Sequence, residues 1–424
     1  MNLIESFVYN KLKSNPRLKL LVRNLYQQLM DLLPRPKEQL PSSIQFKEGF
    51  FFGFHDIKPF NTDSSKVLSN KLLGQDLKMP EKDDALEIGY FTMENDLISE
   101  FKSISKSTAW NYHKGCRLQW INDDWIIFNT SEDNSVPYAK ILNIYTYKEE
   151  KLNFPIDTVS KTGNLVSGFD YGRLELLMPG YGYNWYRSDP KIEKAPKNNG
   201  LKIYNISNKS LVAFLSLSSL KEDALRHGHL SAKDSYHFVT HSLFSDDSNF
   251  IAFLHRWSSP NSLKRTSRLV CFDIKNNTFI ELVSDGMVSH YAWNSANQII
   301  AYSRVNQKDG HYLYDISDPT NTPAPIASDK LNSDGHQHFV SENVFITDTY
   351  PNRMRQASIY KVDLRTHETE IIVRLNSPKK FQTTNFNKHI ACDLHPRMSH
   401  CGKWMSFDSV RTNKRTLHLL KIYP

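Results

Sequence analysis

The sequence predicts an all-β protein, a seven-bladed β-propeller that follows a short N-terminal helical segment. Three observations predict this fold. Apolar residues follow a helical spacing only before residue 43, a strand–turn–strand pattern then recurs about seven times, and the last repeat ends one strand short. We therefore divide the chain into an amphipathic helical segment, residues 1–42, and a propeller domain, residues 43–424.

The helical segment has one apolar stripe between Pro16 and Pro34. Its members recur at intervals of three and four residues, and they are Leu18, Leu21, Val22, Leu25, Leu29 and Leu32. Two interpretations are open. The stripe packs on the rest of the chain, or it binds a membrane surface or a partner protein.

The repeat begins with a strand, a polar turn and an apolar second strand. Examples are "QWINDDWIIFN", "LFSDDSNFIAFLHR" and "AWNSANQIIAYSR". A second hairpin-like pair follows each, such as "SRLVCFDIKNNTFIELV", and a degenerate copy lies around "LVSGFDYGRLELL". Four strands per unit, repeated in this way, are typical of a propeller.

The final repeat, "RTLHLLKIYP", ends after its third strand. The segment "SSIQFKEGF" precedes the first repeat and is free to supply the missing outer strand. Residues 43–49 are therefore expected to pair with residues 415–423, which closes the ring and removes an exposed edge.

Composition limits the cellular setting and the partners. The mean hydropathy is −0.52, and no apolar run is long enough to span a bilayer. The N-terminus lacks the basic and apolar regions of a signal peptide. We therefore expect a cytoplasmic protein, and peripheral attachment to the inner membrane remains open. The net charge of +8 favours an anionic partner. No nucleic-acid-binding signature and no CxxC pair occurs, so nucleic acid is not an expected partner, and an anionic lipid or an acidic glycan remains open.

Histidines recur at one phase of the repeat. We align the repeats on the aromatic or apolar residue that directly precedes each turn. The position three residues earlier is then occupied by Ile57, Arg117, His241, His290, His336 and His395. The first strand of a propeller blade lines the central channel, so these four histidines are expected to converge near one mouth. His338 follows His336 by two residues, and His55 lies near the corresponding place in the first blade.

The second strand of each hairpin returns to the same mouth, where it ends in Arg256 or Tyr350. Converging imidazoles suit a divalent transition metal, and His290, His336 and His338 are the predicted ligands. Asp334 or His395 completes the shell.

The hairpin repeat, the in-phase histidines and the HxH pair in "GHQHF" resemble those of seven-bladed polysaccharide lyases of the oligogalacturonate lyase and ulvan lyase type. Two further segments are similar to uncharacterised members of this superfamily, some associated with bacterial surface-polysaccharide gene clusters. They are "GRLELLMPGYGYN" and "DLHPRMSHCGKWMSFDS".

The resemblance implies a manganese ion held by the HxH pair, a third histidine and a glutamine, although Ser333 stands at the glutamine position and leaves zinc or calcium open. It also implies catalytic roles for an arginine and a histidine near the cleaved bond. The residues assigned by these arguments are, as catalytic groups, His241, Arg256, Arg173, Tyr181 and Tyr183, and as substrate-binding groups His55, His113, His395, Arg397 and Tyr350.

The expected function is a lyase that cleaves a uronic-acid-containing glycan by β-elimination. A cation neutralises the carboxylate, a histidine or arginine takes the α proton, and a tyrosine or histidine protonates the leaving oxygen. Two alternatives remain. One is a non-catalytic propeller that binds glycans or serves as a scaffold in surface-polysaccharide metabolism. The other is a glycoside hydrolase that would use Asp348 and Asp408.

Overall fold

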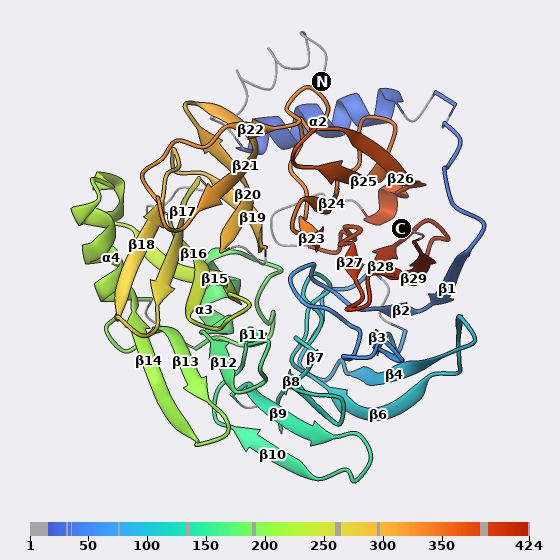
Figure 1. The fold of residues 1–424 in the computed structure, drawn as a ribbon, viewed down its shortest axis with the longest axis horizontal. Coiled ribbons are helices and arrows are strands. Elements are labelled where there is room, and N and C mark those ends of the chain that lie inside the picture. Colours follow the sequence, from blue (N-terminus) through green and yellow to red (C-terminus); the bar gives the residue numbers. More distant parts are fainter. Residues whose placement is uncertain are drawn as a thin grey trace.

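A computed structural model describes residues 16–30, 33–34, 36–74, 77–132, 136–188, 192–258, 264–294, 297–381 and 389–422. Seven antiparallel sheets are arranged around one centre (Figure 1). The seven-bladed propeller that the repeats predict is confirmed. The first 15 residues of the expected helical segment lie outside the described residues.

Blades 1 to 3 are built from the first half of the chain. Blade 1 holds β2 (Phe50–Phe51), β3 (Lys66–Lys71), β4 (Leu86–Glu94), β5 (Leu97–Ile98) and β6 (Lys102–Ser107). Blade 2 holds β7 (Gln119–Trp120), β8 (Trp125–Thr130), β9 (Tyr138–Asn143) and β10 (Glu149–Leu152). Blade 3, the degenerate repeat, holds β11 (Thr158–Val159), β12 (Leu165–Gly168), β13 (Gly200–Asn205) and β14 (Ser210–Ser216).

Blades 4 to 6 follow the regular repeat more closely. Blade 4 holds β15 (Tyr236–Phe244), β16 (Phe250–Ser258), β17 (Arg265–Asp273) and β18 (Thr278–Leu282). Blade 5 holds β19 (Val288–Trp293), β20 (Gln298–Val305), β21 (Lys308–Asp315) and β22 (Pro325–Ile326). Blade 6 holds β23 (His338–Ser341), β24 (Val344–Asp348), β25 (Gln356–Asp363) and β26 (Thr369–Asn376).

Blade 7 joins the two ends of the propeller domain. It holds β27 (Arg397–Met398), β28 (Trp404–Ser409), β29 (Thr416–Lys421) and, as its outer strand, β1 (Ile44–Glu48). Ile44 pairs with Leu420 and Glu48 with Thr416. The ring closure expected from the incomplete last repeat is therefore confirmed.

Helices occupy the connections outside the sheets. They are α2 (Pro16–Met30), α3 (Tyr171–Leu177), α4 (Leu217–Arg226) and the 3-10 turns η1 (Leu230–Ala232) and η2 (Lys379–Phe381). Asp170 caps α3 by accepting from the backbone N–H of Gly172 and Arg173. This helix is inserted between β12 and β13, which explains why the third repeat is hard to recognise in the sequence.

The hydrophobic core lies between neighbouring blades. Apolar clusters join blades 2 and 3, blades 4 and 5, blades 5 and 6, and blades 6 and 7. Strands buried on both faces explain the continuous apolar runs of the second strands, such as "FIAFL" at 250–254. The faces of neighbouring blades pack against each other. The side chains at the start of each innermost strand therefore point toward the central axis of the ring.

Candidate functional site

Six histidine rings surround the side chain of Phe54 at the centre of the propeller. Their ring centroids lie 4.6–6.0 Å from that of Phe54, and they belong to His55, His113, His241, His290, His336 and His395. All seven side chains are buried. The in-phase histidines of blades 4 to 7 therefore converge, and His55 joins them from the segment before β3.

Irregular backbone aims several of these side chains at the centre. The pairing of β15 with β16 shifts register beside His241, and that of β19 with β20 shifts beside His290. His241 and His395 have positive φ angles of 57° and 44°. Such bulges and left-handed residues cost backbone energy and re-aim side chains, and they gather at functional sites.

Five of the six rings, all but that of His113, have one nitrogen held by a hydrogen bond to the protein. Nδ1 of His395 donates to the carbonyl of Gly53 at 2.7 Å, and Nδ1 of His55 donates to the carbonyl of Gln337 at 3.2 Å. A carbonyl oxygen only accepts, so these two Nδ1 atoms carry the proton and leave a lone pair on Nε2. Both Nε2 atoms are buried and have no hydrogen-bond partner among the described residues.

His336 repeats this arrangement because its partner is a carboxylate, whereas the partner of His241 is a hydroxyl that can donate or accept. Nδ1 of His336 lies 2.8 Å from Oδ1 of Asp348, and Nδ1 of His241 lies 2.8 Å from the hydroxyl of Thr240. Their Nε2 atoms are buried and unpaired within the described chain. Buried polar atoms normally have partners. Several buried imidazoles whose Nε2 atoms have no partner among the described residues therefore indicate a candidate ligand-binding site.

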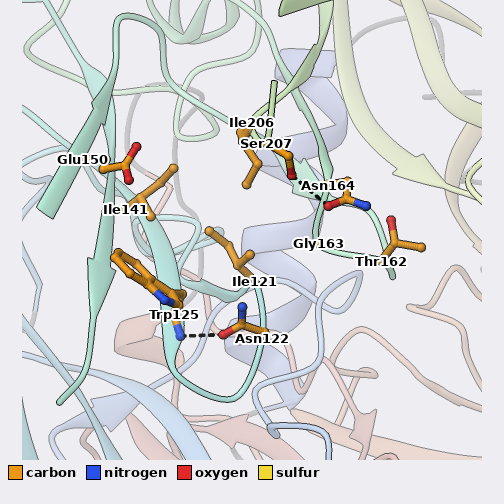
Figure 2. Close-up of a pocket in the computed structure, with 10 residues that line it drawn as sticks. All are labelled: Ile121, Asn122, Trp125, Ile141, Glu150, Thr162, Gly163, Asn164, Ile206 and Ser207. Carbon is orange, nitrogen blue, oxygen red and sulfur yellow. Dashed lines mark hydrogen bonds between the residues drawn. The ribbon is translucent and has the colours of Figure 1, made fainter. Parts of the chain in front are cut away.

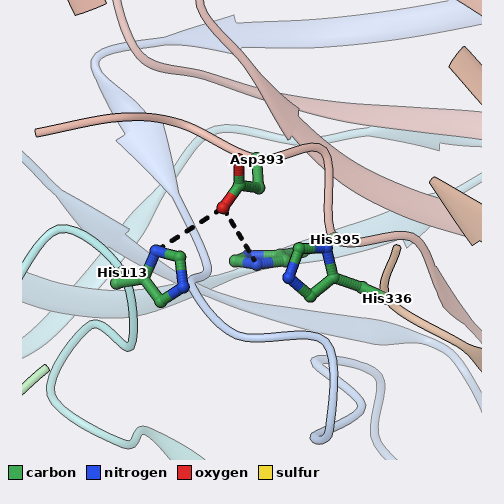
Figure 3. A group of neighbouring side chains, drawn as sticks. All are labelled: His113, His336, Asp393 and His395. Carbon is green, nitrogen blue, oxygen red and sulfur yellow. Dashed lines mark ion pairs between the residues drawn. The ribbon is translucent and has the colours of Figure 1, made fainter. Parts of the chain in front are cut away.

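Four buried side chains form a candidate ligand group, whereas a second group, Asp223, His227 and Glu281, is partly exposed. One nitrogen or oxygen atom from each of His113, His336, Asp393 and His395 lies within 4.8 Å of the others (Figure 3). Oδ2 of Asp393 lies 3.7 Å from Nδ1 of His113 and 3.9 Å from Nε2 of His395. Three imidazoles and one carboxylate are ligands that suit a divalent transition metal. Neither nitrogen of His113 has a hydrogen-bond partner in the described part of the chain, which fits this role.

Burial sets most of the protonation states in this group. It lowers the pKa of His113 and of His395, and neighbouring histidines lower both further, so these rings are neutral. Burial also lowers the pKa of His336, but the charge and hydrogen bond of Asp348, together with the charges of Asp393 and Asp334, outweigh burial and raise that pKa to about 8. Burial raises the pKa of Asp393 to about 6.

The predicted metal trio is only partly brought together. The rings of His290 and His336 lie 4.1 Å apart, and Nδ1 of His290 is 3.2 Å from Oδ1 of Asp334. His338 instead has Nδ1 3.3 Å from the carbonyl of His55, and it is not a member of the four-residue group. His336 precedes β23 whereas His338 begins it. Residues i and i+2 point to the same side only within a regular strand, so these two side chains need not point the same way.

A basic and phenolic face lies beside the ligand group. Two carbonyl oxygens, those of Val288 and Ser289, accept from the guanidinium of Arg256 at 3.2 and 3.1 Å, and its Nε is buried without a partner. No carboxylate within the described ranges forms an ion pair with Arg256. Burial, followed by the charge of Arg265, lowers its pKa to about 10, so it remains a cation near neutral pH.

Two tyrosines complete this face. The ring of Tyr181 lies 4.3 Å from that of His113 and 6.1 Å from that of His241, and burial raises the pKa of its phenol. Tyr350 is 39% exposed while its ring lies 5.7 Å from that of His336. Tyr350 is thus the partly exposed member of this face.

Three other predicted site residues lie in supporting positions. Arg173 donates to the carbonyls of His237, Glu193 and Lys194, so it anchors a neighbouring loop. Tyr183 is stacked on Tyr171 with a centroid distance of 4.5 Å. Arg397 donates to the carbonyl of Gly53 and to Asp408.

Sequence reasoning missed Asp393 and His389. Asp393 precedes His395 by two residues, so the signal was a DxH pair next to an in-phase histidine. His389 packs 4.8 Å from His113 and 5.1 Å from Tyr181. His113 itself was assigned by resemblance as a substrate-binding residue, and the structure places it among the candidate ligands.

A separate groove of about 230 Å³ lies between blades 2 and 3 (Figure 2). Its walls come from hairpin turns and outer strands, including Ile121, Trp125 and Asn164. It shares no residue with the histidine group and lacks ionisable side chains other than Glu150. We assign it no part in the chemistry.

No protein-family model matches the sequence, and no relative was found among curated proteins. Solved structures are similar in fold. An oligogalacturonate lyase in complex with manganese is 11% identical with a TM-score of 0.57, and the match covers 92% of this chain and 97% of that one. The oligogalacturonate lyase of Vibrio parahaemolyticus is 10% identical with a TM-score of 0.57, covering 91% and 96%.

The tricorn protease also contains a similar region. It is 10% identical with a TM-score of 0.49, and the match covers 92% of this chain but 34% of that one. The TM-scores and coverages of the two oligogalacturonate lyases show a shared fold, and the low identities show nothing beyond it. The chain is thus similar in fold to oligogalacturonate lyases over nearly its whole length.

Proposed function

We propose that this protein is a metal-dependent carbon–oxygen lyase that cleaves a uronic-acid-containing oligo- or polysaccharide by β-elimination. The observation that carries the proposal is the group of His113, His336, Asp393 and His395, whose three ring Nε2 atoms are buried and have no hydrogen-bond partner among the described residues. The fold similarity to oligogalacturonate lyases, one of them in complex with manganese, supports the same chemistry.

These four residues would hold a divalent ion, with manganese favoured by the similarity. When bound, such an ion supplies positive charge that stabilises the enolate formed from a uronate carboxylate. Arg256 contributes a second positive charge, and it has no carboxylate partner of its own within the described residues. Its planar guanidinium suits a carboxylate. Substrate anions are therefore expected to bind on the Arg256 side of the group.

His241 is the candidate base. Burial, then the charges of Lys114 and Arg256, lowers its pKa, so the ring is neutral and its unpaired Nε2 is ready to accept a proton. Tyr181 is the candidate acid, because its phenol keeps its proton and its ring lies 6.1 Å from that of His241. His241 takes the proton α to the carboxylate, the bond from the β carbon to its oxygen breaks, and Tyr181 protonates that oxygen.

A glycoside hydrolase gains less support. Asp348 accepts from His336 and His395, and Asp408 accepts from Arg397 and from the backbone N–H of Phe52 and Gly53. Both carboxylates are thus occupied in holding the centre together. Neither is placed as a free acid or base.

The test is an elimination assay. Protein loaded with manganese is mixed with a panel of uronate oligosaccharides, and formation of the unsaturated uronate is followed by ultraviolet absorbance and mass spectrometry. His241→Ala and Tyr181→Phe should each lose most of the turnover while keeping the metal. The proposal fails if metal-loaded protein binds members of the panel and forms no unsaturated product, or if it releases only hydrated sugars.

A further inference from the structure

The helix α2 exposes a continuous apolar stripe. Four leucines, Leu18, Leu21, Leu25 and Leu29, recur at intervals of three and four residues, so they share one helix face. Each is between 42% and 62% exposed, and Leu33, which follows the helix, is 49% exposed. The leucine stripe is therefore not the face by which α2 packs on the propeller.

The chain just after α2 is fixed to the ring. Gln39 and Arg374 of blade 6 exchange backbone hydrogen bonds of 2.9 Å, and Glu38 forms an ion pair with Arg411 of blade 7 at 2.8 Å. The side chain of Gln356 donates to the carbonyl of Pro36 at 3.0 Å. These contacts fix residues 36–39 to blades 6 and 7, and α2 lies at the rim of the ring (Figure 1).

The sequence of α2 is cationic. Residues 16–30 contain Arg17, Lys19 and Arg23 and no aspartate or glutamate, within a chain whose net charge is +8. Large apolar stripes on soluble proteins are uncommon unless something covers them. A helix that combines leucines on one face with only basic charges has the composition of helices that lie in the interface of an anionic bilayer.

The length of α2 fits this position. At about 1.5 Å per residue, its 15 residues span about 22 Å, which is less than the roughly 30 Å of a bilayer core. None of the described helices is long and apolar enough to cross a membrane. A helix of this kind lies along the surface and buries its leucines at the level of the headgroups.

We infer that α2 docks the protein on the surface of an anionic lipid bilayer, with Leu18, Leu21, Leu25 and Leu29 inserted and the propeller held outside. This inference is independent of the proposed lyase activity. Basic charge distinguishes the bilayer from a second copy of the chain, because two such helices would bring like charges together.

The test uses the full-length protein and vesicles. Co-sedimentation is measured with phosphatidylcholine vesicles and with vesicles that also contain phosphatidylglycerol, at low and high salt. We expect binding to the anionic vesicles that weakens with salt. The double variant Leu21→Glu/Leu25→Glu should bind them about tenfold more weakly or worse. Leu211→Glu is the matched control, because Leu211 on β14 is as exposed as Leu21, at 57%.

Circular dichroism and thermal melting should be the same for all variants, since the substituted leucines are exposed. The inference is overturned if wild-type protein ignores anionic vesicles, or binds neutral and anionic vesicles equally. It is also overturned if the wild type is a dimer in solution that the double variant converts to a monomer, because the leucines then cover a second copy. Equal loss in Leu211→Glu would likewise show that the helix is not the docking element.

Discussion

The Asp348 carboxylate accepts two hydrogen bonds from His336, one from its backbone and one from its side chain. Its Oδ1 accepts from the backbone N–H and from Nδ1 of His336, each at 2.8 Å. Its Oδ2 accepts from the backbone N–H of His395, also at 2.8 Å. One buried carboxylate at the end of β24 thus positions two of the four candidate ligands and joins blade 6 to blade 7.

The substitution Asp348→Asn should weaken metal binding without removing a ligand. An asparagine has one acceptor oxygen and no charge, so it cannot keep all three hydrogen bonds. We expect the affinity for manganese or zinc to fall by about 10- to 100-fold, as for other residues that orient metal-bound histidines. Calorimetric titration measures this. Asp363→Asn, at a surface turn of the same blade, is the control, and equal affinities for all three proteins would refute the role given to Asp348.

Arg256→Lys tests carboxylate recognition. An ammonium group cannot reproduce the planar fork, and hydrogen bonds to charged groups contribute about 1.5–3 kcal/mol, so kcat/KM should fall roughly 10- to 100-fold. The metal content should not change. Arg411→Lys, which alters an ion pair at the rim, serves as the matched control. Unchanged kinetics in Arg256→Lys would remove this residue from the substrate site.

Asp157 anchors a buried charge network below the histidines. Oδ1 lies 2.8 Å from Nζ of Lys114, and Oδ2 accepts from the backbone and hydroxyl of Ser242 at 2.9 and 2.8 Å. Burial raises the pKa of Asp157, but the charges of Arg117 and Lys114 outweigh it, and the pKa lies below its usual value.

Because the folded pKa is depressed, the ionised Asp157 stabilises the protein at neutral pH. That stabilisation is lost as the pH falls below about 4, the value in unfolded chains, toward the folded pKa. Asp157→Asn should therefore lower the free energy of unfolding by about 3 kcal/mol at pH 7, and the difference from wild type should shrink in acid. Urea unfolding across this pH range measures it. A difference that stays constant with pH would contradict the assigned ionisation.

The closing strand makes a prediction about truncation. Deleting residues 1–34 removes α2 and leaves β1, so the propeller should melt cooperatively at nearly the same temperature as the full chain. Deleting residues 1–50 also removes β1, whose partner β29 then becomes an exposed edge. We expect a broad transition at lower temperature by calorimetry. Identical melting of the two truncated proteins would show that β1 does not close the ring.

The sequence predicts the ring of blades and the convergence of four histidines because both follow a regular period. The turn positions predict that His241 and His395 converge, and their rings do gather around Phe54, although each histidine lies in an irregular stretch of backbone. The repeat does not predict the positions of residues in the segments between the repeated hairpins. Phe54, which fills the centre, lies in a stretch that belongs to no repeated hairpin, and His113 and Asp393 lie in loops.

The HxH pair shows the same limit. The sequence treats residues 336 and 338 as one side of a strand, but the strand begins at His338, so their side chains are not related by alternation. Asp348 controls the direction of His336, and it is 12 residues away in the chain. The orientation of a ligand by a carboxylate on the neighbouring strand cannot be inferred from spacing alone.

The most direct test of this account is the metal content of single-histidine variants. Wild type, His336→Ala, His395→Ala and His338→Ala are purified under identical conditions, loaded with manganese, desalted and analysed for bound metal. The group of His113, His336, Asp393 and His395 predicts about one ion in the wild type and in His338→Ala, and strong depletion in the other two variants. Loss of metal in His338→Ala with retention in His395→Ala, or a wild type that binds no metal, would contradict it.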